Sequence, residues 1–166
     1  MSSSREQLVE YLILSELLQD SWLRRREFIE VLRADVDAAG YDLLLECGRV
    51  ARHVQLKSSV VGGSTKKQKV HTALAQKPSG CMLWAVLTPA PANRIQLEYF
   101  VFGGKPSAPL PKLDGFPVAL HTKRNALGVR TPRPGLSAPG CQGGPVHSQR
   151  PAVRVEQSTL SAWLSG

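Results

Sequence analysis

Three polar side chains are of types that can assist attack on a phosphate ester. Asp42 opens one apolar run of residues, and Gln55 and Lys57 lie two residues apart in the next run. A carboxylate and an amide oxygen are ligands for Mg²⁺, which keeps several waters and needs only one or two protein carboxylates. An ammonium group can orient the attacking water and stabilise the charge that grows on the phosphoryl oxygens. Together these residues are candidates for metal-assisted attack on a phosphate ester.

The two apolar runs have the pattern of two strands joined by a short turn. Strand side chains alternate between two faces, so Gln55 and Lys57 share a face. A two-residue turn at 49–50 would place Asp42 opposite Lys57 and Leu44 opposite Gln55, and the polar groups would converge near a strand end. The turn has no Asn-Gly signal, so a register slipped by one residue is an alternative. The competing interpretation is an ordinary amphipathic hairpin with a solvated polar face.

The residues before this hairpin predict a helix and a strand. Residues 4–20 carry apolar side chains at helical spacing, and Glu16 adjoins the apolar stripe instead of facing fully away from it. Residues 22–26 form a basic connection. We expect a strand at 28–34, because its side chains are β-branched or aromatic and an isolated hairpin is marginal in water. The expected stripe consists of Leu8, Tyr11, Leu12, Ser15 and Leu18, and is widened by Val9, Ile13 and Leu17.

The residues after the hairpin predict a second helix and two more strands. Residues 65–76 have the spacing of a helix, with lysines outward, and Pro78 would end it. Residues 81–87 are apolar throughout, as expected for a strand that is covered on both faces. Residues 94–102 alternate as a further strand. The expected order is therefore helix, three strands, helix and strand, within a core of about residues 4–102.

The composition changes after this core. Residues 103–151 hold most of the prolines and many glycines, so we expect no long regular elements there. Residues 116–121 are a candidate short strand, residues 150–155 have an extended pattern, and residues 158–164 predict a short closing helix. We expect a single domain over the whole chain, with residues 103–166 as an irregular extension.

The charge of the chain favours polyanionic partners. The formal net charge is +8 and the pI is near 9.8, and a compact basic domain attracts phosphates through release of counterions. A basic surface kept for solubility is the alternative. The three cysteines, Cys47, Cys81 and Cys141, have no metal-ligand spacing and no disulfide pattern. We also expect a cytoplasmic protein with no membrane association, because no apolar run approaches the roughly 20 residues of a membrane span and the first residues are no secretory leader.

Two short motifs lie on the expected strands, within this order of elements. They are Gly40-Tyr41-Asp42 and Gln55-Leu56-Lys57-Ser58-Ser59. With them the sequence resembles the PD-(D/E)XK, or restriction-endonuclease-like, nuclease superfamily over about residues 4–88. The resemblance implies an α/β fold with a mixed central β-sheet flanked by helices in the order αβββαβ. Tyr41 replaces the proline of the family motif, and Gln55 replaces its second carboxylate, so metal affinity should fall.

The resemblance also implies a role for each residue of the motifs. Asp42 would be the main ligand of Mg²⁺ (or Mn²⁺), and Gln55 and the backbone carbonyl of Leu56 would complete the protein ligands. Lys57 would assist the attacking water. In this family a glutamate of the first helix often joins the site, and Glu16 is the candidate, with a solvated helix glutamate as the alternative. Asp37, in the turn before the second strand, is the weaker substitute.

Two basic groups are candidates for contacts with nucleic acid. One precedes the strand at 28–34, and the other flanks the start of the helix at 65–76, where free N–H groups would favour a phosphate. For each group a solvated basic face is the alternative. The residues are Arg24, Arg25 and Arg26 in the first group and Lys66, Lys67 and Lys69 in the second.

The sequence therefore predicts a Mg²⁺-dependent endonuclease-like protein that cleaves DNA. The alternative is a non-catalytic nucleic-acid-binding or accessory module with the same fold, in which Gln55 has weakened metal binding. A third hypothesis is a small α/β interaction domain that binds no nucleic acid. The sequence leaves a homodimer open.

Overall fold

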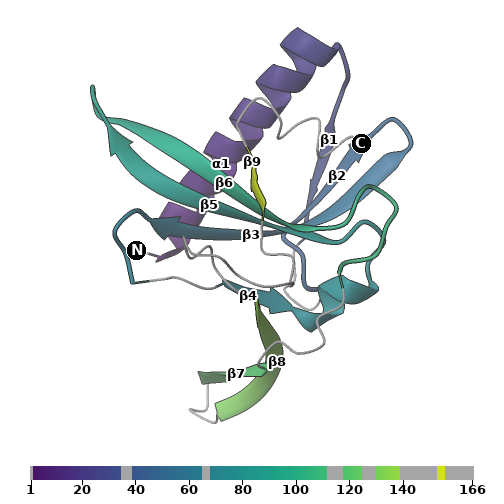
Figure 1. Cartoon of the computed structure of the whole chain (residues 1–166), viewed down its shortest axis with the longest axis vertical. Helices are drawn as coiled ribbons and strands as arrows, with labels where there is room; N and C mark the ends of the chain where they lie inside the picture. Colours follow the sequence, from purple (N-terminus) through teal and green to yellow (C-terminus); the bar gives the residue numbers. More distant parts are fainter. Residues whose placement is uncertain are drawn as a thin grey trace.

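A computed structural model of the chain describes residues 2–34, 39–64, 68–111, 118–124, 130–138 and 153–155. One long helix lies against a sheet that forms the main body of the molecule (Figure 1). The elements are α1 (Ser2–Asp20), a π-helical turn η1 (Ser21–Arg25), β1 (Glu30–Arg33), β2 (Leu43–Cys47), β3 (Val50–Val60), β4 (Gln68–His71), a 3₁₀ helix η3 (Thr72–Gln76), β5 (Cys81–Ala90), β6 (Arg94–Gly103), β7 (Val118–Arg124), β8 (Arg130–Ala138) and β9 (Val153–Val155). Among the described helices none is long and apolar enough to cross a membrane.

The main sheet is mixed, which agrees with the expected α/β class. Its six strands have the order β1-β2-β3-β5-β6-β9. β3 and β5 are parallel, and every other neighbouring pair is antiparallel. A second, three-stranded sheet has the order β4-β8-β7. Each strand expected between 28 and 102 is present, with its ends shifted by a few residues.

The segment that crosses from β3 to β5 differs from the expectation. The helix predicted at 65–76 is wrong, because residues 68–71 form β4 and only the short η3 follows. His71 has an extended backbone, and its Nδ1 accepts a hydrogen bond from the N–H of Ala73, so the helical turn begins only at Thr72. The backbone of β4 pairs instead with β8, which lies about 60 residues further along the chain. Local periodicity cannot detect such a partner.

The C-terminal part contains more strand than expected. β7 matches the short strand predicted at 116–121, and β9 lies in the stretch predicted to be extended. β8 was not expected, because Pro132 and Pro134 cannot donate a backbone hydrogen bond. The register places both prolines beyond the end of β4 and opposite Thr122 and Leu120 of β7. The predicted helix at 158–164 lies outside the described residues.

Helix α1 packs on the sheet with a different face from the one expected. Its buried apolar residues are Val9, Ile13, Leu14 and Leu17, whereas Leu8, Tyr11 and Leu18 are 40–58% exposed. The helix is apolar around most of its circumference, so spacing alone did not fix which stripe faces the sheet. The residues expected to widen the stripe are in fact its centre.

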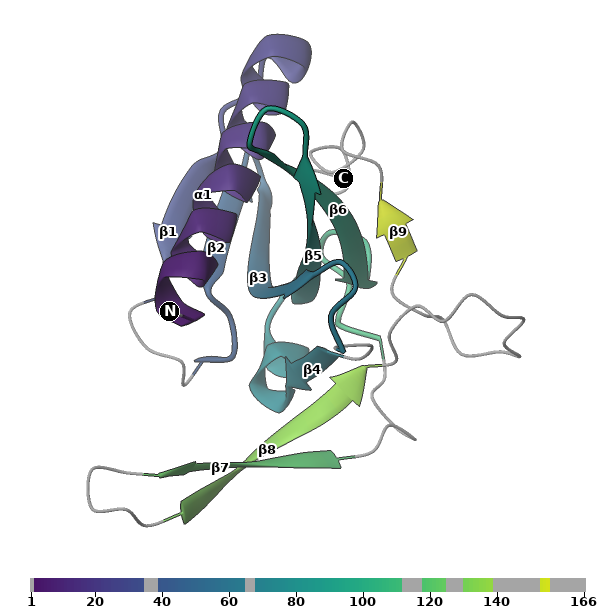
Figure 2. The same cartoon turned by 90° about the vertical axis from the view of Figure 1, so that its left-hand side faces the viewer.

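Two apolar clusters cover the two faces of the sheet. The first joins α1 to Leu43, Val54, Leu83 and Tyr99. The second joins β4 and η3 to the other face through Val70, Leu74, Met82, Trp84 and Phe102. Figure 2 shows α1 in front of the sheet and β4 below it. The sheet therefore has a helix on one face and the β4–η3 crossing on the other.

Gly40 is the point where the chain before β2 touches this crossing. Its φ is +76°, and a Cβ at this position would lie 2.8 Å from His71 Nδ1 and 3.0 Å from the backbone nitrogen of Leu74. Glycine adopts this backbone conformation without a steric penalty and has no Cβ to make these contacts. The close approach lets η3 pack directly beside the start of β2.

We expect Leu17→Ala to lower the free energy of unfolding by about 2–5 kcal/mol, because it opens a cavity in the first cluster. Leu17 is 1% exposed. The control is Leu18→Ala on the same helix, whose side chain is 40% exposed and whose loss should cost about 1 kcal/mol or less. Urea unfolding followed by circular dichroism measures both. Equal losses would contradict the observed orientation of α1.

A second prediction concerns Gly40. We expect Gly40→Ala to destabilise the protein by at least about 1 kcal/mol more than Gly48→Ala, since a methyl group would overlap His71. Gly48 also has a positive φ, of +59°, but no atom lies within 4 Å of its ideal Cβ. The pair therefore shares the backbone strain and differs only in crowding. Thermal unfolding of the two variants tests this, and similar midpoints would argue against the close approach.

Candidate functional site

The turn between β2 and β3 lies one residue earlier than the primary expectation. Cys47 pairs with Val50, so the turn residues are Gly48 and Arg49 and not 49–50. The reason is Gly48, whose positive φ of +59° suits the first central position of a tight hairpin turn. The pairing therefore shifts by two residues, which keeps the same faces: Leu44 lies opposite His53 and not opposite Gln55.

The shift brings Asp42 to a different part of β3. The N–H of Asp42 donates to the carbonyl of Val54 at 2.9 Å, and Oδ2 of Asp42 accepts from the N–H of Leu56 at 2.6 Å. The carboxylate thus takes the place of a strand partner where the β2–β3 ladder stops. A strand residue directs its N–H and C=O toward the same neighbour. The carbonyl of Leu56 therefore points toward β2, on the side of β3 where the Asp42 carboxylate lies.

Gln55 is held by β4, in the segment that crosses from β3 to β5. Its side chain is 8% exposed, and Oε1 accepts a hydrogen bond of 3.0 Å from the N–H of His71. Lys57 is half-buried and shares this face of β3 with Gln55 and Ser59. Ser59 Oγ accepts from Nε1 of Trp84 at 2.9 Å, and Trp84 belongs to the second cluster. Gln55 and Lys57 therefore lie on the face that β4 and η3 cover.

Glu16 lies on the other side of the sheet. The hydroxyl of Tyr99 donates a hydrogen bond to Glu16, and Tyr99 is buried in the cluster beneath α1. Burial, together with this hydrogen bond, raises the pKa of Tyr99 well above its ordinary value. The structure thus does not bring Glu16 to Gln55. Asp37, the weaker substitute, lies outside the described residues.

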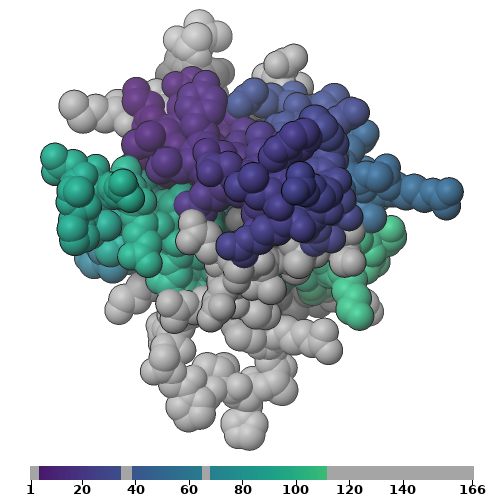
Figure 3. Space-filling model, turned by 90° about the horizontal axis from the view of Figure 1, so that it is seen from above, coloured from purple at the N-terminus to yellow at the C-terminus, as the bar shows by residue number. Residues whose placement is uncertain are grey.

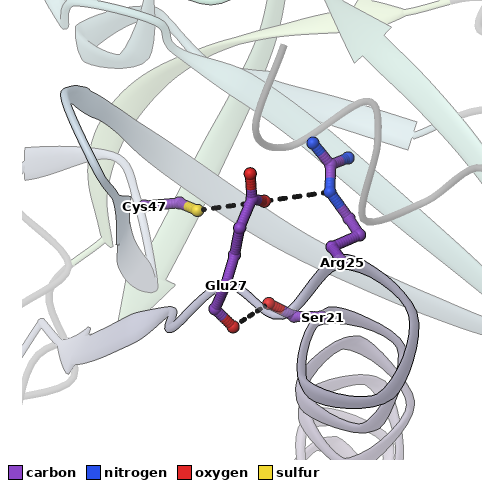
Figure 4. A network of polar contacts seen from close by, with 4 residues as sticks. All are labelled: Ser21, Arg25, Glu27 and Cys47. Atoms are coloured by element: carbon purple, nitrogen blue, oxygen red, sulfur yellow. Dashed lines mark hydrogen bonds and ion pairs between the residues drawn. The ribbon is translucent and has the colours of Figure 1, made fainter.

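The arginines after α1 are engaged with carboxylates. Arg24 forms an ion pair of 3.1 Å with Asp20, and Arg25 forms one of 2.9 Å with Glu27. Figure 4 shows Glu27 between Arg25 and Cys47, with Ser21 bonded to its carbonyl. Arg24 and Arg25 are therefore partly neutralised within their own segment.

These arginines are also remote from Asp42 along the sheet. They precede the start of β1, whereas the carbonyl of Asp42 accepts from the N–H of Ala34, just past the end of β1. Arg26 is exposed, in the left-handed conformation that ends η1. The segment that carries them stands at the front of the surface in Figure 3. The structure separates this group from the other predicted site residues.

The lysine group is only partly described. Lys69 is half-buried on β4 and is the register partner of Ser137. The phosphate site predicted at a helix start is wrong for Lys69, because η3 begins three residues later, at Thr72. Lys66 and Lys67 lie outside the described residues.

Tyr41, His53 and Lys77 make contacts with one another and with Pro78 that the sequence did not predict. The rings of Tyr41 and His53 meet edge to face, with centroids 4.7 Å apart, and Lys77 Nζ lies 5.5 Å from the centroid of Tyr41. Nδ1 of His53 lies 2.8 Å from the carbonyl oxygen of Pro78. The period of two along β3 was a signal for His53, because residues 53, 55 and 57 share a face. Lys77 had no such signal, since it follows η3.

The ligands that the site offers to a metal ion are all oxygens. They are the carboxylate of Asp42, the amide oxygen of Gln55 and the carbonyl of Leu56. In the described residues no group of three or more His, Cys, Asp or Glu side chains is placed to hold a metal ion. One carboxylate with neutral oxygens fits a hard cation that retains most of its water, such as Mg²⁺, and predicts weak binding.

Comparison of the chain with protein-family models, with curated proteins and with solved structures finds no match.

Proposed function

We propose that this chain is a metal-dependent nuclease of the PD-(D/E)XK kind, which hydrolyses phosphodiester bonds in DNA. The observation that carries the proposal is the hydrogen bond from the N–H of Leu56 to Asp42 Oδ2, at 2.6 Å. It joins the only carboxylate of the expected motif to the strand segment between Gln55 and Lys57. The mixed sheet, with β3 antiparallel to β2 and parallel to β5, is compatible with the fold that the resemblance implies.

In this proposal Mg²⁺ or Mn²⁺ is held by Asp42, Gln55 and the carbonyl of Leu56. A bound divalent ion lowers the pKa of a coordinated water and neutralises charge on the phosphate. Asp42 supplies the one negative charge among these ligands, and its position is fixed by two contacts with β3. A site with a single charge binds its cation weakly, so the affinity should depend strongly on this carboxylate.

Lys57 acts on the substrate itself in this proposal. Its ammonium orients the attacking water and stabilises the charge that develops on the phosphoryl oxygens. β3 is paired on both sides, with β2 and with β5, so the base of the Lys57 side chain is rigidly held. Such a group needs little reorganisation during the reaction. The net charge of +8 favours a polyanionic substrate.

A second function is favoured by one specific observation. The amide oxygen of Gln55 already accepts the N–H of His71 at 3.0 Å. If this hydrogen bond keeps the amide oxygen from binding a cation, Asp42 and the Leu56 carbonyl are the remaining metal ligands. The chain would then be a nucleic-acid-binding module without catalysis. The two functions share the fold and the basic charge, and they differ in whether a metal ion binds.

We expect Asp42→Asn and Lys57→Ala each to reduce cleavage of plasmid DNA by at least about 100-fold with Mg²⁺ or Mn²⁺. Asn keeps the shape of the side chain and removes the charge that holds the cation. Ala removes the ammonium and leaves β3 intact. Initial rates of plasmid nicking measure both effects.

Glu46→Gln and Lys105→Ala are the matched controls for this experiment. Glu46 lies at the far end of β2, opposite Ala51, and Lys105 is exposed beyond β6. Both should retain the wild-type rate. Cleavage that survives both Asp42→Asn and Lys57→Ala would refute the site, and binding of DNA without cleavage by the wild type would favour the second function.

The replacement Gln55→Glu tests the ligand role of this position. A second carboxylate should tighten Mn²⁺ binding by about tenfold, because ligand charge sets affinity in oxygen sites. Electron paramagnetic resonance of free Mn²⁺ gives the dissociation constant without any need for activity. Gln96→Glu adds the same charge on an exposed part of β6 and should leave Mn²⁺ binding unchanged. Equal affinity in wild type and both variants would remove Gln55 from the ligand set.

A further inference from the structure

Strands β7 and β8 form a ribbon that leaves the body of the molecule. They pair from Val118 and Leu136 to Arg124 and Arg130. β4 borders β8 only from Gly135 to Ala138, so the rest of β8 has β7 as its one partner among the described strands. Figures 1 and 2 both show the ribbon at the lower end of the molecule, away from α1 and the six-stranded sheet. Its distal half is the part formed by residues 121–124 and 130–133.

The two halves of the ribbon differ in composition. The half next to β4 contains Val118, Leu120 and Leu136. The distal half contains no large apolar residue, and neither strand contains Asp or Glu. Its cationic residues are Lys123, Arg124, Arg130 and Arg133, beside His121.

The register places two arginines at directly opposite positions near the distal end of the ribbon. Arg124 is the partner of Arg130. Like charges at directly opposite positions destabilise an antiparallel pair, and a two-stranded ribbon is marginal in water by itself. Within the described strands the ribbon carries no acidic residue to offset this repulsion. A polyanion alongside it would offset the repulsion.

The dimensions of the ribbon fit a nucleic-acid duplex. Two paired strands lie about 4.8 Å apart, and the major groove of B-DNA, about 12 Å wide, admits a two-stranded ribbon. From Gly135 to Arg130 the strand covers roughly 17 Å, which corresponds to about half a helical turn. Gly135 is the register partner of His71, whose N–H holds Gln55. The ribbon therefore begins beside the segment that contacts Gln55 and extends away from it.

We propose that the distal half of the β7–β8 ribbon is an arm that binds duplex DNA through phosphate contacts along a groove. The arm deepens the proposed function and rests on it, since it would hold the same substrate that the site cleaves. The lack of large apolar residues in the distal half disfavours insertion into a membrane surface, where such side chains supply the affinity. The arm thus contributes binding that is independent of sequence and sensitive to salt.

The test uses the full chain with Lys123, Arg124, Arg130 and Arg133 all replaced by Gln. Binding to a fluorescein-labelled duplex of about three helical turns is measured by anisotropy in EDTA, over a series of salt concentrations. We expect binding at least about 30-fold weaker near 0.15 M salt, and a slope of log K against log salt smaller by about 3. The wild type is also assayed for cleavage in Mn²⁺.

The control variant loses the same charge elsewhere. Arg5, Arg49, Arg94 and Lys105 are exposed, and their replacement by Gln changes the net charge equally. If the control variant binds the duplex as weakly as the ribbon variant does, the proposed arm is refuted, because the loss of affinity would then come from net charge alone. Thermal midpoints of both variants, compared with wild type, confirm that the fold is kept.

Two further outcomes separate the arm from the nuclease. Ribbon-dependent binding in EDTA with no cleavage in Mn²⁺ would support the arm and refute the hydrolytic function. Binding of anionic phosphatidylserine vesicles that depends on the ribbon, with no ribbon effect on the duplex, would overturn the proposal in favour of a membrane surface.

Discussion

The parallel pairing of β3 with β5 is the constraint on which the rest of the structure depends. Parallel neighbours require the chain to cross from one end of the sheet to the other, and residues 61–80 make this crossing. α1 covers one face, so the crossing covers the other. It brings the N–H of His71 to Gln55, packs η3 against Gly40 and offers β4 as the edge on which β8 is built. The candidate site and the ribbon are both consequences of this one connection.

The central strand β3 carries three buried polar residues, Arg52, Gln55 and Ser59, and each has a specific partner. The guanidinium of Arg52 is fully buried and donates two hydrogen bonds of 3.2 Å to the carbonyl of Gly104. Burial lowers the pKa of Arg52 from its ordinary value. Gln55 and Ser59 are bonded to His71 and to Trp84, respectively. A slip of one residue would exchange the faces of all these groups, so polar contacts as well as apolar packing fix the register.

The sequence predicted the strands well because their signals are local, and it failed where a distant partner decided the outcome. Alternation located β3, and the glycine at position 48 settled its register by a single backbone angle. The helix expected at 65–76 was wrong because β8 supplies the backbone partners of β4. Glu16 was chosen from its place beside an apolar stripe, but α1 packs with another stripe and lies across the sheet from Gln55. Most element types were thus predictable, whereas the face of α1 that packs on the sheet and the strand that pairs with β4 depend on tertiary packing.

Gln55 links the structural and the functional demands on the site. An amide oxygen has two lone pairs, so it can accept the N–H of His71 and still face a cation with the other. A carboxylate at this place would offer the same geometry with a charge, but its burial would be costly without the cation. In the proposed function a neutral amide would keep its contact with β4 whether or not a metal ion is bound, and the proposed ribbon arm would stay connected to the sheet. In the proposed nuclease the amide would therefore favour a scaffold that is stable without metal, at the expense of metal affinity, and the single charge of Asp42 would be the decisive one.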